Sequence, residues 1–106
     1  MDKAELEALL EEATVQCYDE EESFWGLFCT LKGRLSFPLQ ARALGEAVTL
    51  VGLDENDSDP QAGVMARVQK GDQERTVALA ELEPLNPDPV SAEWLAVYRY
   101  WLGKAE

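Results

Sequence analysis

Apolar residues recur at helical spacing in three segments of the chain. A short stripe near the N-terminus is formed by Leu6, Leu9, Leu10 and Ala13. A longer stripe, at positions i, i+3, i+4 and i+7, is formed by Phe24, Leu27, Phe28 and Leu31. A third, near the C-terminus, is formed by Trp94, Tyr98 and Trp101. We therefore expect three amphipathic helices, each burying one stripe, with Trp25 and Cys29 widening the apolar face of the second.

Polar residues and glycines indicate where these helices begin and end. Asp2 precedes Glu5 by three residues, and Asp19 precedes Glu22 by the same interval, which is the spacing of a capping box. The remaining expected boundaries are Gly33 at the end of the second helix, Ser91 at the start of the third and Gly103 at its end. Gly26 falls inside the second helix at a cost of about 1 kcal/mol relative to alanine, and a close backbone approach would explain it.

Between the second and third helices the period changes to two. Alternation or β-branched enrichment predicts strands over residues 39–44, 47–53, 63–69 and 75–79, with turns at Gly45-Glu46 and Lys70-Gly71-Asp72. Residues 80–83 are expected to form one helical turn before Pro84. The predicted class is α+β: four or five short antiparallel strands in a meander or small SH3-like barrel, with helices on one side. We expect a single domain over 1–106, comprising a helical part (1–36), the β part (37–83) and a proline-rich connection with the last helix (84–106).

Composition and charge exclude some classes of partner for this chain. The 106 residues are 46% hydrophobic, which favours a folded core over disorder. Aspartate and glutamate number 21 against 9 lysines and arginines, for a formal net charge of -12. Such a field repels nucleic-acid phosphates and anionic membranes and attracts cations and basic protein surfaces. We therefore expect neither nucleic acid nor membrane as a partner.

The absence of histidine removes the commonest general base and the commonest transition-metal ligand. The two cysteines, Cys17 and Cys29, form no CxxC pair, so a structural zinc site has no basis. We interpret them as reduced, partly buried thiols of a cytoplasmic protein, with a disulfide as the alternative. The acidic N-terminus does not resemble a signal peptide, and no apolar run approaches the roughly 18 residues that span a bilayer.

The most acidic stretch is Asp54-Glu55-Asn56-Asp57-Ser58-Asp59, expected as a loop at the mouth of a hairpin. Calcium takes six to eight oxygen ligands at about 2.3–2.6 Å, and this stretch offers only hard oxygens. Its first, third and fifth residues match the opening ligands of an EF-hand, but Asp59 replaces the required glycine and Met65 the bidentate glutamate. The stretch is therefore not an EF-hand. A looser site would use Asp54, Asp57 and Asp59 with backbone carbonyls.

The alternative is a solvated turn, because Asp, Asn, Ser and Pro are ordinary turn residues. A second acidic run, residues 19–22, has its own alternative, a capped helix start whose carboxylates interact with the helix dipole. The two interpretations of that run are compatible: Asp19 can cap the helix while Glu20 or Glu22 contacts a metal ion.

Several short motifs occur in one order along the chain. They are Tyr18-Asp19-Glu20-Glu21-Glu22, Trp25-Gly26, Leu35-Ser36-Phe37-Pro38, Val51-Gly52-Leu53-Asp54 and Tyr98-Arg99-Tyr100-Trp101-Leu102-Gly103. In this order and spacing the chain resembles the small CcbP-type calcium-binding proteins first described from cyanobacteria. The resemblance covers residues 18–103. It implies an acidic cytoplasmic protein that binds calcium without EF-hands, has an SH3-like barrel with accessory helices and has no catalytic activity.

The leading hypothesis is therefore a non-enzymatic Ca2+ buffer or sensor, with Asp19, Glu20, Glu22, Asp54, Asp57 and Asp59 as the candidate metal ligands. The alternative is an acidic SH3-like interaction module that docks a basic protein partner without specific metal binding. An enzyme is poorly supported, because catalysis would depend on carboxylates alone.

Overall fold

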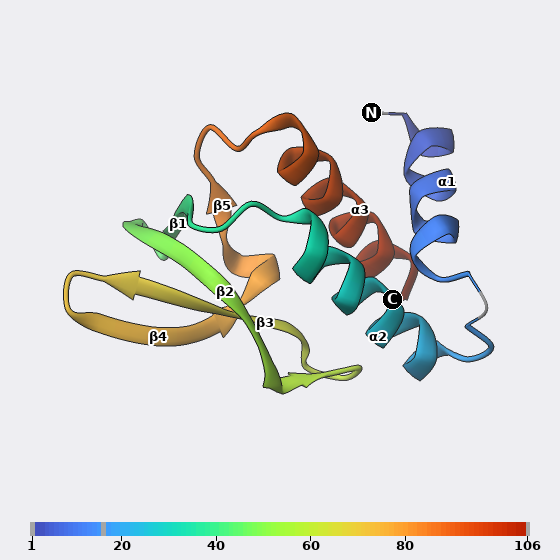
Figure 1. Cartoon of the computed structure of the whole chain (residues 1–106), viewed down its shortest axis with the longest axis horizontal. Helices are drawn as coiled ribbons and strands as arrows, with labels where there is room; N and C mark the ends of the chain where they lie inside the picture. The colour runs from blue at the N-terminus through green and yellow to red at the C-terminus, as the bar shows by residue number, and fades with distance from the viewer. Residues whose placement is uncertain (1, 16, 106) are drawn as a thin grey trace. The chain divides into compact units, whose positions relative to one another are not determined.

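The computed structural model describes residues 2–15 and 17–105. The chain forms two compact units, of which the first joins Met1–Leu35 to Pro89–Glu106 and the second is Ser36–Asp88 (Figure 1). The last helix therefore belongs with the N-terminal helices, while residues 84–88 belong with the β segment. No helix among the described residues has the length and apolar character needed to cross a membrane.

The helical unit contains α1 (Lys3–Ala13), α2 (Glu20–Arg34) and α3 (Pro89–Ala105), and each of the three contacts the other two. The predicted second stripe is buried, because Phe24, Leu27, Phe28 and Leu31 are fully enclosed. In the third stripe Trp94 and Tyr98 are buried, whereas Trp101 is half-buried. Rings from two helices meet, since the centroids of Phe24 and Trp101 lie 5.8 Å apart. The three predicted helices are thus confirmed.

Several predicted details of the helices are wrong. Helix α2 continues through Gly33 to Arg34, and α3 continues through Gly103. Ser91 is a fully buried residue inside α3, which begins at Pro89; proline suits a first helical position because its missing N–H would have no partner in the helix there. Cys29 is exposed, whereas Cys17 is half-buried, and neither forms a disulfide.

Gly26 marks a close approach between α2 and the segment that precedes it. A Cβ built at Gly26 would lie 2.9 Å from the backbone oxygen of Ala13 and 3.0 Å from the Sγ atom of Cys17. Both distances are shorter than ordinary van der Waals contact. The glycine therefore lets the end of α1 pack directly on the backbone of α2, as its position inside a helix suggested.

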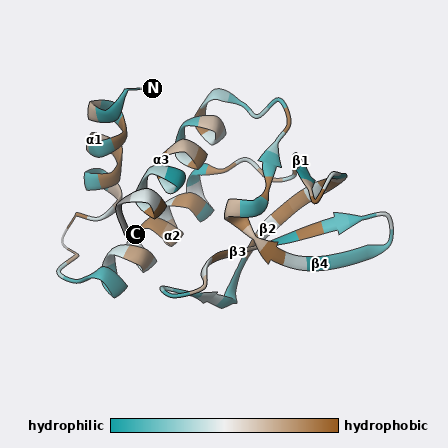
Figure 2. Cartoon of the chain, turned by 180° about the vertical axis from the view of Figure 1, so that it is seen from behind, coloured by the Kyte–Doolittle hydropathy of each residue, from teal (hydrophilic) through white to brown (hydrophobic). Residues whose placement is uncertain are grey.

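The second unit is a five-stranded antiparallel sheet over the described residues, with the order β4-β3-β2-β1-β5. Its strands are β1 (Leu39–Ala43), β2 (Glu46–Asp59), β3 (Gly63–Lys70), β4 (Gln73–Ala78) and β5 (Glu83–Pro84). A 3-10 turn, η1 (Leu79–Glu81), stands where one helical turn was predicted. The sheet is open, with β4 and β5 at its edges, so the closed SH3-like barrel is not confirmed. Figure 2 shows that edge strand β4 is mostly hydrophilic.

The alternating pattern fixes which strand face is buried, but one turn is shifted. Val64, Ala66 and Val68 on β3 are buried as their period of two predicts. The first hairpin closes through Leu44-Gly45, because Ala43 pairs with Glu46. Both turn residues have positive φ, 52° and 81°, as a type I′ turn requires. Glycine was expected at the first central position and occupies the second.

The acidic stretch is not a free loop. Strand β2 runs to Asp59, which pairs with Gly63 of β3, so the turn consists of residues 60–62. Asp54 pairs with Met65, which means that five residue steps on β2 oppose two on β3. Residues 55–58 therefore form an enlarged β-bulge, and we call residues 54–59 the acidic bulge. This placement corrects the predicted hairpin loop.

Candidate functional site

The acidic run 19–22 caps the start of α2 as predicted, but the returning hydrogen bond of the capping box reaches Tyr18, one residue before the Asp19 cap. The Asp19 Oδ1 atom accepts a hydrogen bond from the backbone N–H of Glu22 at 2.8 Å. In return the Glu22 Oε2 atom accepts from the N–H of Tyr18 at 2.9 Å. One carboxylate oxygen of each residue therefore binds the chain itself.

The outer face of this helix start is open to solvent. Asp19, Glu21, Glu22 and the half-buried Trp25 line a hollow of about 470 Å³. Glu20 and Glu21 are exposed, and Tyr18, immediately before the run, is 88% exposed. This end of α2 thus presents carboxylates beside an indole ring.

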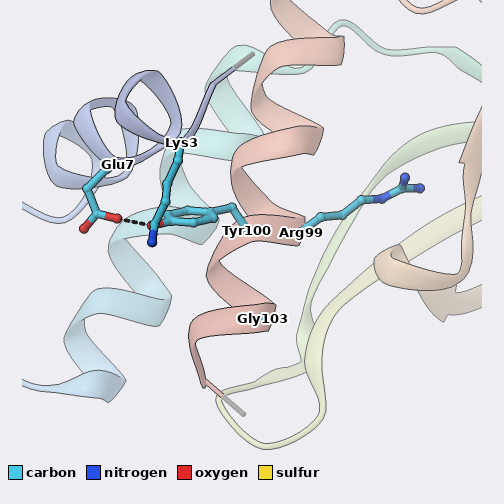
Figure 3. A pocket seen from close by; sticks show the side chains of 5 residues that line it. All are labelled: Lys3, Glu7, Arg99, Tyr100 and Gly103. Carbon is cyan, nitrogen blue, oxygen red and sulfur yellow. Dashed lines mark hydrogen bonds between the residues drawn. The ribbon is translucent and has the colours of Figure 1, made fainter.

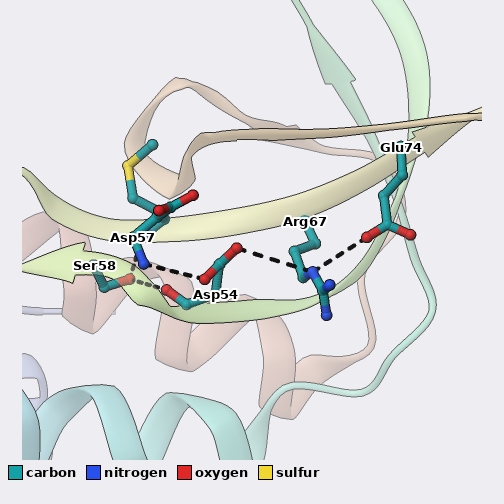
Figure 4. Close-up of polar contacts among 6 residues, drawn as sticks. Asp54, Asp57, Ser58, Arg67 and Glu74 are labelled. Carbon is teal, nitrogen blue, oxygen red and sulfur yellow. Dashed lines mark hydrogen bonds and ion pairs between the residues drawn. The ribbon is translucent and has the colours of Figure 1, made fainter.

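The acidic bulge is organised around Ser58, the buried polar residue of this segment (Figure 4). Its hydroxyl donates to the backbone oxygen of Asp54 at 2.6 Å and accepts from the N–H of Met65 at 2.8 Å. The Asp54 Oδ1 atom accepts from the N–H of Asp57 at 3.1 Å. The bulge therefore has a fixed backbone, with one hydroxyl joining β2 to β3.

The three predicted ligands of the bulge differ in what they still offer a cation. Asp59 Oδ1 accepts from the N–H groups of Gln61 and Ala62 at 2.8 and 2.6 Å, which closes the turn. The Asp57 carboxylate forms no hydrogen bond or ion pair with another described side chain and is exposed. Asp54 is the most shielded of the three, with 17% of its side chain exposed.

Arg67 and Ser58, neither of which is among the predicted ligands, both contact Asp54. The Arg67 Nε atom is 4.0 Å from Asp54 Oδ2 and 3.2 Å from Glu74 Oε1 (Figure 4). The alternation of β3, which turns Arg67 outward between Ala66 and Val68, was the available clue. The sequence offers Ser58 as an EF-hand-like oxygen, but its hydroxyl joins the two strands.

The donor chemistry fits calcium, but the ligands are not gathered in advance. Of the six predicted carboxylates, Asp19, Glu20 and Glu22 lie in the helical unit, and Asp54, Asp57 and Asp59 in the sheet unit. In the part of the chain that the structure describes, no three Asp, Glu or Cys side chains form a group that could hold a metal ion. A bound ion would need backbone carbonyls and water besides these carboxylates.

Another ion pair joins the start of β2 to the end of β3. Lys70 Nζ lies 2.9 Å from Glu46 Oε1. The hydrogen bond from Lys70, followed by its charge, lowers the pKa of Glu46. Both side chains are about half exposed, so this pair contributes little to stability.

A further hollow, of about 500 Å³, lies between α1 and α3 (Figure 3). The Tyr100 hydroxyl donates to Glu7, and Lys3 lies beside the same ring, while Arg99 points away from Lys3. The two cationic groups therefore do not converge on one ligand.

The fold and the donor set define an acidic α+β protein whose oxygen-rich segment leads from strand to strand, unlike an EF-hand. A family model described as calcium binding, of the CcbP type, matches residues 7–102. The chain therefore belongs to the CcbP-type calcium-binding family, which confirms the resemblance read from its motifs.

Solved structures agree on the fold. The crystal structure of Anabaena CcbP superposes with a TM-score of 0.81 at 23% identity, covering 96% of this chain and 91% of that one. A calcium-binding protein solved in its calcium-binding form gives a TM-score of 0.80 at 23% identity, covering 99% and 98%. No curated protein matches the chain.

Proposed function

We propose that this protein binds Ca2+ and serves as a cytoplasmic calcium buffer without catalytic activity. The observation that carries the proposal is membership of a calcium-binding family over residues 7–102, in a chain whose exposed clusters hold only hard oxygens. The proposed ligands are Asp19, Glu20 and Glu22 at the start of α2, and Asp54, Asp57 and Asp59 in the acidic bulge.

A buffer is favoured over a sensor by the rigidity of the bulge. Ser58 joins both strands, and the side chains of Asp54 and Asp59 already close their own turns. A sensor uncovers apolar surface when calcium binds, whereas a buffer changes little. An ion arriving at a bulge with this fixed backbone would reorient carboxylates and leave the sheet as it is.

Two further features support the rest of the proposal. The unpaired thiols of Cys17 and Cys29 suit a reducing compartment. The net charge of -12 opposes binding to nucleic acid or to anionic lipid. Affinity is expected in the roughly micromolar to sub-millimolar range, because exposed carboxylates lose conformational entropy on binding.

The test compares thermal unfolding in calcium chloride, magnesium chloride and sodium chloride at matched ionic strength. Ligand binding to the folded form adds about 2.7 kcal/mol at a hundredfold excess over Kd, which raises Tm by on the order of 10–20 °C. Magnesium should do less, because it gives up its water reluctantly. Equal shifts from all three salts would reject the proposal and leave the acidic module for a basic partner.

Terbium luminescence tests whether an ion binds at the start of α2, near Asp19, Glu20 and Glu22. The ion takes oxygen ligands as calcium does and is sensitised by a nearby indole, and Trp25 shares a hollow with Asp19, Glu21 and Glu22. Sensitised emission that calcium displaces, and that Trp25→Phe removes while Trp101→Phe retains, would place an ion at the start of α2. Displaceable emission that survives Trp25→Phe would count against Asp19, Glu20 and Glu22 as ligands.

A further inference from the structure

Arg67 connects the acidic bulge to the neighbouring strand. It lies on β3 between two carboxylates, Asp54 at the edge of the bulge on β2 and Glu74 on β4. Its Nε atom is 3.2 Å from Glu74 Oε1 and 4.0 Å from Asp54 Oδ2. Figure 4 shows the three side chains in one row, with the guanidinium in the middle.

In this row both carboxylate oxygens of Asp54 already have partners, so neither is free to bind an incoming cation. Its Oδ1 atom accepts the Asp57 N–H, and its Oδ2 atom faces Arg67. Asp54 is also mostly shielded, with 17% of its side chain exposed, whereas 54% of the Arg67 side chain is exposed. A calcium ion that uses Oδ2 must therefore either displace the guanidinium or bind close to its positive charge.

Glu74 offers Arg67 a second partner. The Glu74 contact is the shorter of the two, and about half of the Glu74 side chain is exposed, so Arg67 can move off Asp54 and stay paired. An arginine without that second partner would be costlier to displace.

From this arrangement we propose that Arg67 is a built-in competitor of Ca2+ for Asp54 and sets the calcium affinity of the acidic bulge, with Glu74 receiving the guanidinium when the ion binds. The inference rests on the proposed calcium-binding function and assigns the regulation of the same site. Calcium carries two positive charges, so a guanidinium a few ångströms away opposes it, and exposed charges so close are only partly screened at physiological salt.

The test is calorimetric titration of the intact protein with calcium at physiological salt. Arg67→Gln should tighten binding by about three- to tenfold, from removing one charge near the ion. Arg67→Lys, which keeps the charge, should stay nearer the parent. Glu74→Gln should weaken binding, because Arg67 then has Asp54 as its remaining partner in the row.

Lys70→Gln is the matched control. It makes the same change in net charge on the same strand, but Lys70 pairs with Glu46. A general charge effect would improve binding equally in Arg67→Gln and Lys70→Gln and would overturn the proposal. The effect should also depend on Asp54: in an Asp54→Asn background, Arg67→Gln should change affinity less than about twofold.

The failures are distinguishable. If the parent binds calcium and Arg67→Gln binds it equally well, Arg67 is not a competitor of Ca2+, while the calcium-binding function is retained. If parent and variants all give no calcium heat, the proposed function itself fails. Thermal unfolding of each variant without calcium checks that the fold is intact, so that differences in the titration arise from binding.

Discussion

Ser58 accepts a hydrogen bond from the backbone N–H of Met65 at 2.8 Å and so joins the acidic bulge to the neighbouring strand. The same hydroxyl donates to the backbone oxygen of Asp54 at 2.6 Å. This segment carries four carboxylates in six residues, and their mutual repulsion opposes a compact backbone. The serine therefore gives the most acidic stretch of the chain a defined backbone.

Ser58→Ala should destabilise the protein by about 1–2 kcal/mol, because it leaves the Met65 N–H and the Asp54 carbonyl without their partner. The corresponding fall in Tm is about 5–15 °C. Ser23→Ala is the control, since the half-buried Ser23 hydroxyl has no hydrogen bond to the described residues. Equal effects of the two substitutions in thermal unfolding would contradict the role of Ser58.

Gly26→Ala should destabilise the helical unit even though alanine is the better helix former. The new methyl would lie 2.9 Å from the Ala13 backbone oxygen, a clash with main chain that costs about 1–3 kcal/mol against a propensity gain of about 1 kcal/mol. Gly33→Ala, in the same helix with nothing within 4 Å, should stabilise by about 0.5–1 kcal/mol. Opposite shifts in the urea midpoint are expected, and shifts of the same sign would count against the close packing at Gly26.

Asp19 separates the two roles of the first acidic run. Asp19→Asn keeps the cap, so stability without calcium should change by only a few tenths of a kcal/mol, whereas Asp19→Ala should lose about 1 kcal/mol. Calcium affinity should fall in both variants, because each removes a carboxylate. Unchanged calcium binding by Asp19→Asn would show that the run is a helix cap alone.

The Glu46–Lys70 pair predicts a small pH dependence. Because Lys70 lowers the pKa of Glu46, the pair stabilises the fold above the ordinary glutamate pKa, and the contribution is lost as pH falls through the lowered value. An NMR titration should find the Glu46 pKa below that of an unpaired glutamate in the parent and raised in Lys70→Gln. An identical Glu46 pKa in both proteins would show that the ion pair does not form in solution.

Periodicity predicted much of the fold because burial follows it. One face is buried in each of the helices that carry Phe24 and Trp94, and in strand β3. The Asp19–Glu22 spacing predicted a hydrogen-bond pattern that is local to the chain. The predicted helix ends at glycine were wrong, because a helix tolerates a glycine such as Gly33 at modest cost. Strand β5 was missed because its two residues are held by pairing with β1, which no local pattern encodes.

The acidic bulge shows which part of the candidate site the sequence could not predict. Acidic composition predicted a loop, but pairing of Asp59 with Gly63 extends β2 through it. The contact of Arg67 with Asp54 depends on the register between β2 and β3, which the bulge itself shifts. Residue types thus predicted the ligand chemistry, while the partners of each carboxylate required the structure.

Calcium binding by these carboxylates is tested most directly by calorimetric titration with calcium in physiological salt and excess magnesium. The parent should give a saturable heat with Kd in the roughly micromolar to sub-millimolar range. The Asp54→Asn/Asp57→Asn variant and the Glu20→Gln/Glu22→Gln variant should each lose or weaken one class of site while remaining folded. A parent that gives no saturable calcium heat, or two variants that bind calcium as the parent does, would contradict the account.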